Sequence, residues 1–380
     1  MDFSFGIEEE FFVVCEKTQV LESHAHEAFL ARAKALSDGG VHRELLQSQV
    51  EATTPVCSDF KEARAHLRRL RAALVTAGQE NGLSVIAAGT HPTAEWPGQQ
   101  QTEKQRYDTV MEELKILGLR NLVCGMHVHV EVPDDELRID VMRRIIPFLP
   151  VLLALSTSSP FWRGMDTGFS CYRLTAYDEL PRTGLPPLFA GWAEYQDYVE
   201  KLQQAGVVAD ASYMWWAIRP SHKYQTLELR IADACTYVED VLTVAALYRC
   251  LVRALIENRD IHAGIGSPER GLARENKWHV QRFGLAAELV NPFGETGAIG
   301  AREAVQQLLG MLRPHAVALD CLREAEGALS ILARGTSSDR QRGIYRAALD
   351  DSGGDTGEAL TRVKAWLAGE TRACCEPAEA

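Results

Sequence analysis

The sequence lacks several patterns that would place it in familiar classes of protein. No run of about 18 apolar residues occurs, so we expect no membrane span. The first residues read directly as a strand, without the basic and apolar regions of a secretory signal, and we expect none. The nine cysteines include no C-x-x-C pair, which argues against a zinc ribbon or a disulfide scaffold and favours a reducing, cytoplasmic location.

Common nucleotide-binding and hydrolase signatures are also absent. The chain has no G-x-x-x-x-G-K-[ST] loop, no dinucleotide fingerprint and no G-x-S-x-G elbow. If the protein binds phosphate, metal ions must therefore form the site. The formal net charge of -12 argues against nucleic acid and anionic membranes as partners. It does not exclude an anionic substrate, because bound cations reverse the local field.

The composition is that of an ordinary globular protein. Of the 380 residues, 46% are hydrophobic and 24% are charged, and no internal repeat or linker divides the chain. We therefore predict a single catalytic domain over residues 1–370, followed by a disordered tail over residues 371–380.

The segment of residues 3–14 reads as a strand with two different faces. Its aromatic and aliphatic side chains share one face with Glu9, which we expect to be a paired structural carboxylate. Glu8 and Glu10 point to the opposite face, where they repel each other unless a cation or an arginine lies between them. We interpret this second face as one wall of a metal-filled cavity. The alternative is a solvated strand face.

Three later segments repeat this division between an apolar face and a face with Glu or His. They span residues 44–55, 122–132 and 224–233. We therefore predict a largely antiparallel sheet, with helices packed on one face and a cavity on the other. The predicted cavity side chains are Glu8, Glu10, Glu51, His127, His129, Glu228 and Arg230.

Shorter signals predict the remaining elements. Residues 83–88 and 214–218 read as strands, and the chain is mostly helical from about residue 275, with a late turn over residues 335–342. Capping boxes at Asp59 and at Thr236 predict the starts of two long helices.

The collected ligand types indicate hard divalent cations. Four of the predicted cavity residues are carboxylates, and about two or three divalent ions would balance their charge. Carboxylates with one or two imidazoles suit Mg²⁺ or Mn²⁺ better than a structural zinc. Such a floor commonly holds a nucleoside triphosphate, with arginines neutralising the transferred group. The available arginines are Arg163, Arg173, Arg219 and Arg230.

Each element taken alone has a simpler interpretation. A His-x-His pair on a strand is more often packing or zinc than a nucleotide site. Arg230 and Glu228 also fit a simple salt bridge, and Glu131 fits a solvated position beyond the sheet edge. The combination over four strands favours the metal-lined cavity.

The ordered motifs resemble a known family. The sequence is similar to the type 2 glutamate–cysteine ligase-like proteins, or carboxylate–amine ligases, over roughly residues 3–350. The motifs that carry the resemblance are Phe5–Phe11, Gln49–Glu51, Cys124–Val130, Phe161–Gly164, Thr167–Gly168, Arg219–Ser221, Thr226–Asp233, Glu275–Trp278 and Asp339–Gln341. One departure is Glu131, where the family often has glycine, and it adds negative charge near the site.

The resemblance implies a fold, an activity and partners. The fold is an α+β, glutamine synthetase-like catalytic fold, whose curved, mainly antiparallel sheet forms a funnel with helices on its outer face. The activity is that of an ATP-dependent carbon–nitrogen ligase with two to three Mg²⁺ or Mn²⁺ ions. The implied substrates are a small carboxylic acid, with glutamate as the first choice, and an amine, of which cysteine is one candidate. A homodimer is also implied.

The resemblance also implies residue roles. The implied metal ligands are Glu8, Glu10, Glu51, His127 and Glu228. For nucleotide contacts we predict His129, Arg163, Arg230 and Lys277. For charge stabilisation during catalysis we predict Arg173, Arg219 and Arg230.

The expected reaction forms an amide through an acyl phosphate, without a nucleophile from the enzyme. Two other functions fit the same residues. A metallohydrolase would use the carboxylates, His127 and His129 to activate water and would need no ATP. A non-catalytic relative would bind a nucleotide or an amino acid without releasing ADP.

Overall fold

A computed structural model describes residues 1–24 and 26–373 of the chain. Its strands are β1 Phe5–Cys15, β2 Val41–Arg43, β3 Gln49–Thr53, β4 Leu83–Ile86, β5 Met126–Glu131, β6 Phe161–Trp162, β7 Met165–Asp166, β8 Ile218–Pro220, β9 Thr226–Leu229, β10 Glu288–Val290 and β11 Ala298–Gly300. Its α-helices are α1 Glu27–Leu36, α2 Phe60–Glu80, α3 Gln105–Leu114, α4 Ile116–Leu119, α5 Asp135–Arg144, α6 Leu149–Ser156, α7 Arg173–Tyr177, α8 Trp192–Gln204, α9 Val238–Glu257, α10 Ser267–Phe283, α11 Ala301–Ala318, α12 Leu322–Arg334, α13 Ser337–Ser352 and α14 Thr356–Ala373. Short 3₁₀ turns are η1 Ile146–Phe148, η2 Ala211–Tyr213 and η3 Gly284–Ala286.

The main sheet is organised around its first strand. The strand order is β2-β3-β1-β5-β9-β8, and β4 adds to the C-terminal half of β1. Every strand pair within this sheet is antiparallel. Strand β1 pairs with β3, β4 and β5, so residues from three other strands are placed in register against it.

The outer face of the sheet carries the core. Phe5 and Ile7 of β1 are buried together with Val128 of β5 and Leu229 of β9. Alternate residues of a strand point to opposite faces, so the same strands keep Glu and His on the inner face. Helices α2 and α9 cover the outer face, and the hydroxyl of Tyr248 on α9 donates to the carbonyl of Leu227, 3.0 Å away.

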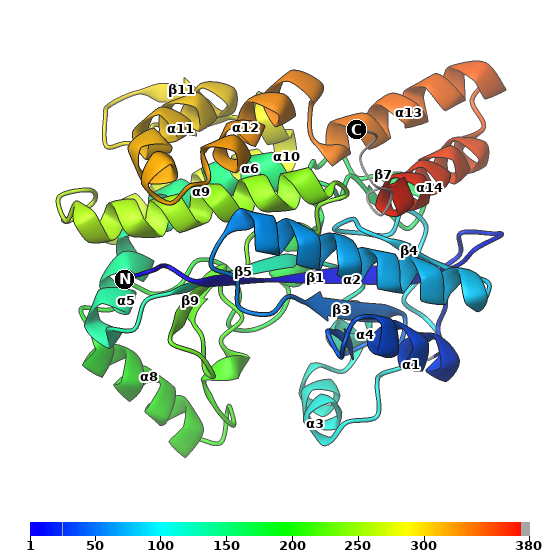
Figure 1. Cartoon of the computed structure of the whole chain (residues 1–380), viewed down its shortest axis with the longest axis horizontal. Coiled ribbons are helices and arrows are strands. Elements are labelled where there is room, and N and C mark those ends of the chain that lie inside the picture. The colour runs from blue at the N-terminus through cyan, green and yellow to red at the C-terminus, as the bar shows by residue number, and fades with distance from the viewer. Residues whose placement is uncertain (25, 374–380) are drawn as a thin grey trace.

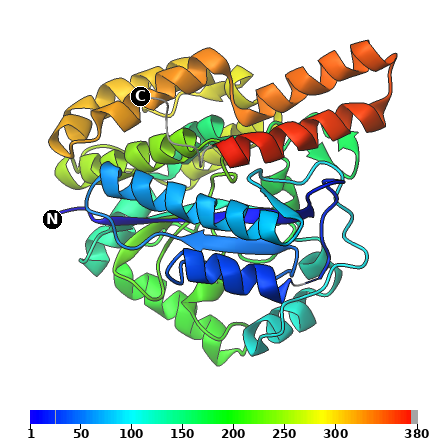
Figure 2. The same ribbon diagram turned by 45° about the vertical axis from the view of Figure 1, so that its right-hand side comes forward.

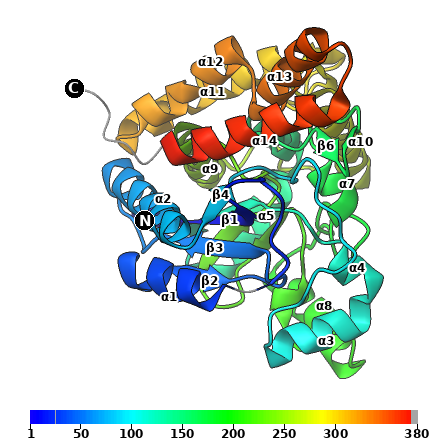
Figure 3. The ribbon, with the colours of Figure 1, turned by 90° about the vertical axis from the view of Figure 1, so that its right-hand side faces the viewer.

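Further helices form layers beyond α9. Figure 1 shows α11 and α12 stacked over α9 on the side of the sheet away from α3 and α8. Figure 2 shows α13 and α14 side by side at the edge of this helical layer, with α14 reaching back to β4. In Figure 3, α3 and α4 lie across the molecule from α1 and α2. The inner face is bordered by α3 and the segment before β8, whereas the outer face is covered by packed helices.

The α+β class and the mainly antiparallel sheet are confirmed, as are the two faces predicted for residues 3–14. Helix α2 begins as predicted, because the Asp59 side chain accepts a hydrogen bond from the backbone N–H of Glu62 at 2.8 Å. Glu9 is buried and paired with Arg71, in agreement with the expectation of a structural carboxylate.

Several boundaries differ from the predictions. The strand predicted over residues 214–218 begins only at Ile218, because two arginines hold the preceding carbonyls. Residues 44–48 bend before β3 instead of joining it. Helix α9 begins after Tyr237, because the hydroxyl of Thr236 donates to the carbonyl of Ala87 instead of capping the helix.

Two predictions near the C-terminus also need correction. The late turn ends at Thr336, which caps α13 through a capping box with Asp339. The predicted tail boundary at residue 371 falls within α14, where the buried hydroxyl of Thr371 accepts from the N–H of Ala87 at 3.1 Å. Residues 374–380 of the predicted tail lie outside the described part of the chain.

Candidate active site

The inner face of the sheet carries a diagonal row of charged side chains set by strand register. Glu51 of β3 is paired with Glu10 of β1, and Glu8 of β1 is paired with His127 of β5. The next pairs bring His129 of β5 opposite Glu228 of β9, and Glu228 opposite Arg219 of β8. Directly paired residues point to the same face. The row therefore crosses five strands and gathers residues far apart in the sequence.

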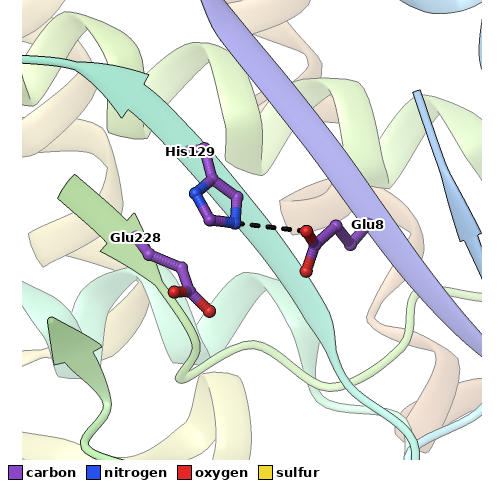
Figure 4. Close-up of side chains that lie close together, drawn as sticks. All are labelled: Glu8, His129 and Glu228. Atoms are coloured by element: carbon purple, nitrogen blue, oxygen red, sulfur yellow. Dashed lines mark ion pairs between the residues drawn. The ribbon is translucent and has the colours of Figure 1, made fainter. Parts of the chain in front are cut away.

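Within the described residues, three overlapping groups, formed by this row together with Glu44, could each hold a metal ion. In each group the ligand atoms lie within 4.8 Å of one another. The groups are Glu8 with His129 and Glu228, Glu8 with Glu51 and His127, and Glu10 with Glu44 and Glu51. Figure 4 shows the first group, with Glu8, His129 and Glu228 projecting from three neighbouring strands toward a common point.

The third group holds excess negative charge. Burial raises the pKa of Glu51 well above its usual value, and the charges of Glu8, Glu44 and Glu10 raise it further. Burial and the charge of Glu10 likewise raise the pKa of Glu44 to about 7. The pKa of Glu10 is also raised by burial, although Arg173 opposes the shift. Carboxylates arranged in this way favour a bound cation that would return them to the ionised form.

In the first group, by contrast, the pKa values of both carboxylates are lowered. Burial alone would raise the pKa of Glu8, but the neighbouring imidazoles of His127 and His129 outweigh it and hold the pKa below its usual value. Burial also opposes ionisation of Glu228, yet the charges of Arg219 and Arg230 keep its pKa well below the usual range. Both carboxylates are therefore ionised at neutral pH, as metal ligands must be.

The two histidines also fit a metal site. Burial, followed by the charge of Arg230, lowers the pKa of His127 to about 4, so its imidazole is neutral at pH 7. Within the described residues, the buried Nε2 atoms of His127 and His129 have no hydrogen-bond partner, although His129 Nε2 lies 3.3 Å from Glu8 Oε1. Buried polar atoms are normally satisfied. Unpaired imidazole nitrogens beside carboxylates are the donor set of a hard divalent cation, and the residues therefore fit such ions.

Most of the charged row forms the floor of a cavity of about 250 Å³, whereas His129 and Glu228 are not among its lining residues. The opposite wall is more apolar and includes Tyr107, Val110 and Leu114 from α3, together with Trp215. The cations that line the cavity are Lys104, Arg106, Arg173, Arg219 and Arg230. Carboxylates, arginines and an apolar wall thus line one cavity.

Arg173 is the most deeply buried of these cations. Its side chain is 2% exposed, and its Nε has no hydrogen-bond partner within the described residues. Its guanidinium can reach the cavity because residue 125 is glycine: a Cβ there would lie 2.1 Å from Arg173 Nη2. The N–H of Gly125 also donates to Glu10 Oε2 at 2.5 Å. Nη1 and Nη2 of Arg173 each donate to the carbonyl of Arg230 at 3.4 Å, so the free Nε and the charge of the guanidinium remain for an anionic group of a ligand.

Arg230 and Arg219 both contact Glu228. Arg230 Nη1 donates to Glu228 Oε1 at 2.5 Å, and Arg230 Nη2 donates to the hydroxyl of Tyr177 at 3.2 Å. Arg219 makes a bidentate pair with the same carboxylate, at 2.8 and 3.1 Å. The simple salt bridge considered from the sequence is therefore present, and its two arginines line the cavity while Glu228 is buried behind them.

The structure does not bring all predicted residues to this cavity. Arg163 is partly exposed in the β6–β7 turn and pairs with Glu95 at 2.7 Å. Lys277 is buried on α10 and pairs with Asp178. Neither belongs to the cavity lining found among the described residues. Glu131 accepts a hydrogen bond from the hydroxyl of Ser4 at 3.0 Å and is not part of the three metal groups.

Glu44 is the residue that sequence reasoning missed. It precedes β3 in a bend, so the two-residue periodicity of the strand did not select it. Its backbone is fixed there by the hydroxyl of Thr102, which donates to the Glu44 carbonyl at 2.6 Å. The only available signal was an additional carboxylate seven positions before Glu51, at the start of the same segment.

The chain has an α+β fold whose inner sheet face carries a charged cavity. The sequence matches the Glutamate-cysteine ligase family 2 (GCS2) over residues 4–363. The chain belongs to this family, and it is an ATP-dependent ligase that forms a carbon–nitrogen bond. Membership does not favour the metallohydrolase or the non-catalytic binding protein.

Relatives of known sequence support the assignment over nearly the full length. A protein of Bradyrhizobium sp. (strain BTAi1) named "Putative glutamate--cysteine ligase 2" is 44% identical over 366 residues, which cover 96% of this chain and 87% of that protein. A protein of Rhodospirillum rubrum with the same name is 43% identical, covering 97% of this chain and 95% of its own length.

Two solved structures share the fold of this chain, although their sequence identity to it is much lower than that of the two relatives above. The glutamate–cysteine ligase of Francisella tularensis, crystallised with AMP, has a TM-score of 0.72 at 14% identity and covers 97% of this chain and 89% of its own. A bifunctional glutathione synthetase of Pasteurella multocida has a TM-score of 0.71 at 14% identity, over 97% of this chain and 52% of its own. Among the described residues, no helix has the length and apolar character needed to cross a membrane.

Proposed function

We propose that the protein joins a small carboxylic acid, glutamate as the first choice, to an amine through an acyl phosphate, using ATP and divalent cations. One observation carries this proposal: the described residues contain three overlapping Glu/His groups, two of which line the same cavity as the buried Arg173, whose Nε has no hydrogen-bond partner. The family and the names of its relatives support glutamate and an amine as the substrates, with cysteine as one candidate amine.

The proposed metal ligands are the residues of the three groups. Glu8 and Glu51 each belong to two groups, so adjacent ions would share carboxylates, which supports two to three Mg²⁺ or Mn²⁺ ions. When bound, these ions neutralise the negative charge of the triphosphate. The full proposed ligand set is Glu8, Glu10, Glu44, Glu51, His127, His129 and Glu228.

The protein's own part in the reaction is to position the reactants and stabilise charge. A substrate carboxylate oxygen forms a bond to the γ-phosphorus of ATP, while the bond from that phosphorus to the β,γ-bridging oxygen breaks and ADP leaves. The amine nitrogen then bonds to the acyl carbon, phosphate leaves with the carbon–oxygen bond electrons, and the amine loses a proton. Arg173 and Arg230 stabilise the charge on the transferred group.

Other predicted roles remain proposals with less support. Arg163 and Lys277 are paired outside the cavity lining, so a nucleotide contact would require their ion pairs to open. We also propose a homodimer working in the cytoplasm. Seven cysteines in the described residues are free thiols, which supports a reducing compartment.

The test is the release of ADP from Mg²⁺ and ATP. Glutamate is added alone, and then together with pools of amines that include cysteine. Release that requires both an acid and an amine is the expected result and begins to identify the substrates. ATP binding without ADP release across a broad panel of acids and amines contradicts glutamate and cysteine as the substrates.

A further inference from the structure

Arg219 connects the metal floor to a segment of the cavity wall. Along one edge its guanidinium holds Glu228, through Nε at 2.8 Å and Nη2 at 3.1 Å. From Nη1 it donates to the carbonyls of Ser212 at 2.8 Å and Met214 at 3.0 Å. Arg219 therefore binds Glu228 of the metal floor and the backbone of the wall segment at the same time, and its side chain is 13% exposed.

A second arginine holds the same wall segment from the other side. Arg182 Nε donates to the carbonyl of Tyr213 at 3.2 Å, so the three consecutive carbonyls of residues 212–214 are all taken by arginines. The guanidinium of Arg182 also lies 5.2 Å from the ring centre of Trp215 and pairs with Glu113 of α3 at 3.1 Å. The segment thus sits between the floor and α3.

The segment held in this way contributes directly to the cavity. Ser212 and Trp215 both line it. Asp210 fixes the start of the segment, because its side chain accepts from the N–H of Ser212 at 2.7 Å. Arg219 holds the carbonyl of Met214, and Trp215 is the next residue in the chain. A movement of Arg219 is therefore expected to displace Trp215.

We propose that Arg219 is a positioning residue that couples metal binding at Glu228 to the placement of Trp215 in the substrate cavity. Both oxygens of Glu228 are already engaged by Arg219, and Oε1 also accepts from Arg230. A cation that binds Glu228 competes with these donors for the same oxygens. The guanidinium is a planar, rigid fork, so a change at its Glu228 edge moves the Nη1 donors that hold residues 212 and 214.

The consequence is an ordered assembly of the site. The wall beside Trp215 reaches its working position only when the cation is bound, and substrate selection therefore depends on metal occupancy. This inference rests on the proposed role of Glu228 as a metal ligand, and the experiment separates the two.

The experiment records Mg²⁺ binding and the response of Trp215 independently. Calorimetry measures Mg²⁺ binding to the full chain. Trp215 emission is the difference between the spectra of the wild-type protein and Trp215→Phe, recorded during the same titration. The test variant is Arg219→Lys, which keeps the charge but cannot hold a carboxylate and two carbonyls at once. The matched control is Arg120→Lys, in a partly exposed pair with Glu179.

The expected result is a Trp215 response to Mg²⁺ in the wild-type protein and in Arg120→Lys. In Arg219→Lys, Mg²⁺ still binds, but the Trp215 response is lost even at saturating metal. A full response in Arg219→Lys, or an unresponsive Trp215 in a wild-type protein that binds Mg²⁺, overturns the coupling. Absence of Mg²⁺ binding to the wild-type protein instead overturns the proposed metal site, and the coupling with it.

A second variant keeps the test decisive if Arg219→Lys does not fold. Glu228→Gln removes the charge that links the cation to Arg219 and leaves the group of Glu10, Glu44 and Glu51 intact. It should still bind Mg²⁺ at that group but lose the Trp215 response. A preserved response in Glu228→Gln overturns the inference.

Discussion

Glu9 and Arg71 form a buried ion pair directly behind the charged inner face of β1. Arg71 Nε donates to Glu9 Oε2 at 3.2 Å, and Arg71 Nη2 donates to Glu9 Oε1 at 2.5 Å. The side chain of Glu9 is 2% exposed and that of Arg71 is 0% exposed. Arg71 also donates to the carbonyls of Cys235 and Thr236, just before α9. The pair therefore joins β1 to α2 and to the start of α9 on the outer face, between the positions of Glu8 and Glu10.

Replacement of Glu9 by Gln should destabilise the fold without removing the metal site. Loss of one partner leaves the charge of Arg71 buried, and we expect the free energy of unfolding to fall by about 3–5 kcal/mol. Urea unfolding measures the change, and calorimetry with Mg²⁺ checks that binding persists. The control Glu80→Gln, in an exposed pair with Arg32, should leave stability nearly unchanged. Equal stability of the two variants would show that the buried pair is dispensable.

Replacement of Glu44 by Gln should weaken metal binding. Glu44 completes the group with Glu10 and Glu51, and loss of its charge removes one of three carboxylates from that group. We expect the affinity for Mn²⁺ to fall by at least about 10-fold, as measured by electron paramagnetic resonance of free and bound ion. Glu80→Gln, far along α2, is again the control. Unchanged Mn²⁺ binding in Glu44→Gln would remove Glu44 from the ligand set.

Replacement of Gly125 by Ala should lower activity more than stability. The new Cβ would lie 2.1 Å from Nη2 of Arg173, and the flexible end of that side chain must move away from the cavity. We expect ATP turnover to fall by about 100-fold, the scale of losing one charge-stabilising donor, with little change in melting temperature. The control is Gly343→Ala on α13, where a Cβ meets nothing within 4 Å. Full turnover in Gly125→Ala would exclude a catalytic need for this position of Arg173.

Stability should decline below neutral pH partly because of His91. Its Nε2–H donates to the carbonyl of Gln19 at 3.0 Å and its Nδ1 accepts from the N–H of Thr93 at 3.3 Å, so both nitrogens are used in the neutral form. Burial, with a smaller effect of the charge of Lys364, lowers the pKa of His91 to about 3. The unfolded chain titrates near pH 6.5, so between these values the unfolded state binds the extra proton.

The contribution of His91 is therefore complete above about pH 6.5 and is lost as the pH falls toward 3. This contribution is measured as the difference in the free energy of unfolding between the wild-type protein and His91→Gln, from urea unfolding at several pH values. The stability advantage of the wild type should shrink by about 2 kcal/mol between pH 7 and pH 5. A constant difference over this range would contradict a neutral, buried His91.

The sequence predicted the sheet faces because strand periodicity is a local property. Glu8, Glu10, Glu51, His127 and Glu228 all lie on strands whose opposite face is apolar, and the structure places all five on the inner face. Alternation alone was sufficient for this part of the site.

The remainder depends on packing between segments that are distant in the sequence. Glu44 reaches the floor from a bend, and Trp215 reaches the wall because arginines hold an irregular segment. Neither position has a periodic pattern. Arg163 and Lys277 lie in motifs as prominent as the strand motifs, yet packing of the β6–β7 turn and α10 directs them to Glu95 and Asp178.

The register of the inner-face row limits how the chain can change length during evolution. A single residue inserted within β5 would turn His127 and His129 to the apolar face and bring apolar side chains onto the floor. The same holds for β1, β3 and β9, since each contributes ligands by its pairing. Insertions and deletions are therefore tolerated only in the connections, such as residues 89–104 and 178–191, and descendants of one ancestral enzyme can diverge in substrate there while the strands keep a constant length.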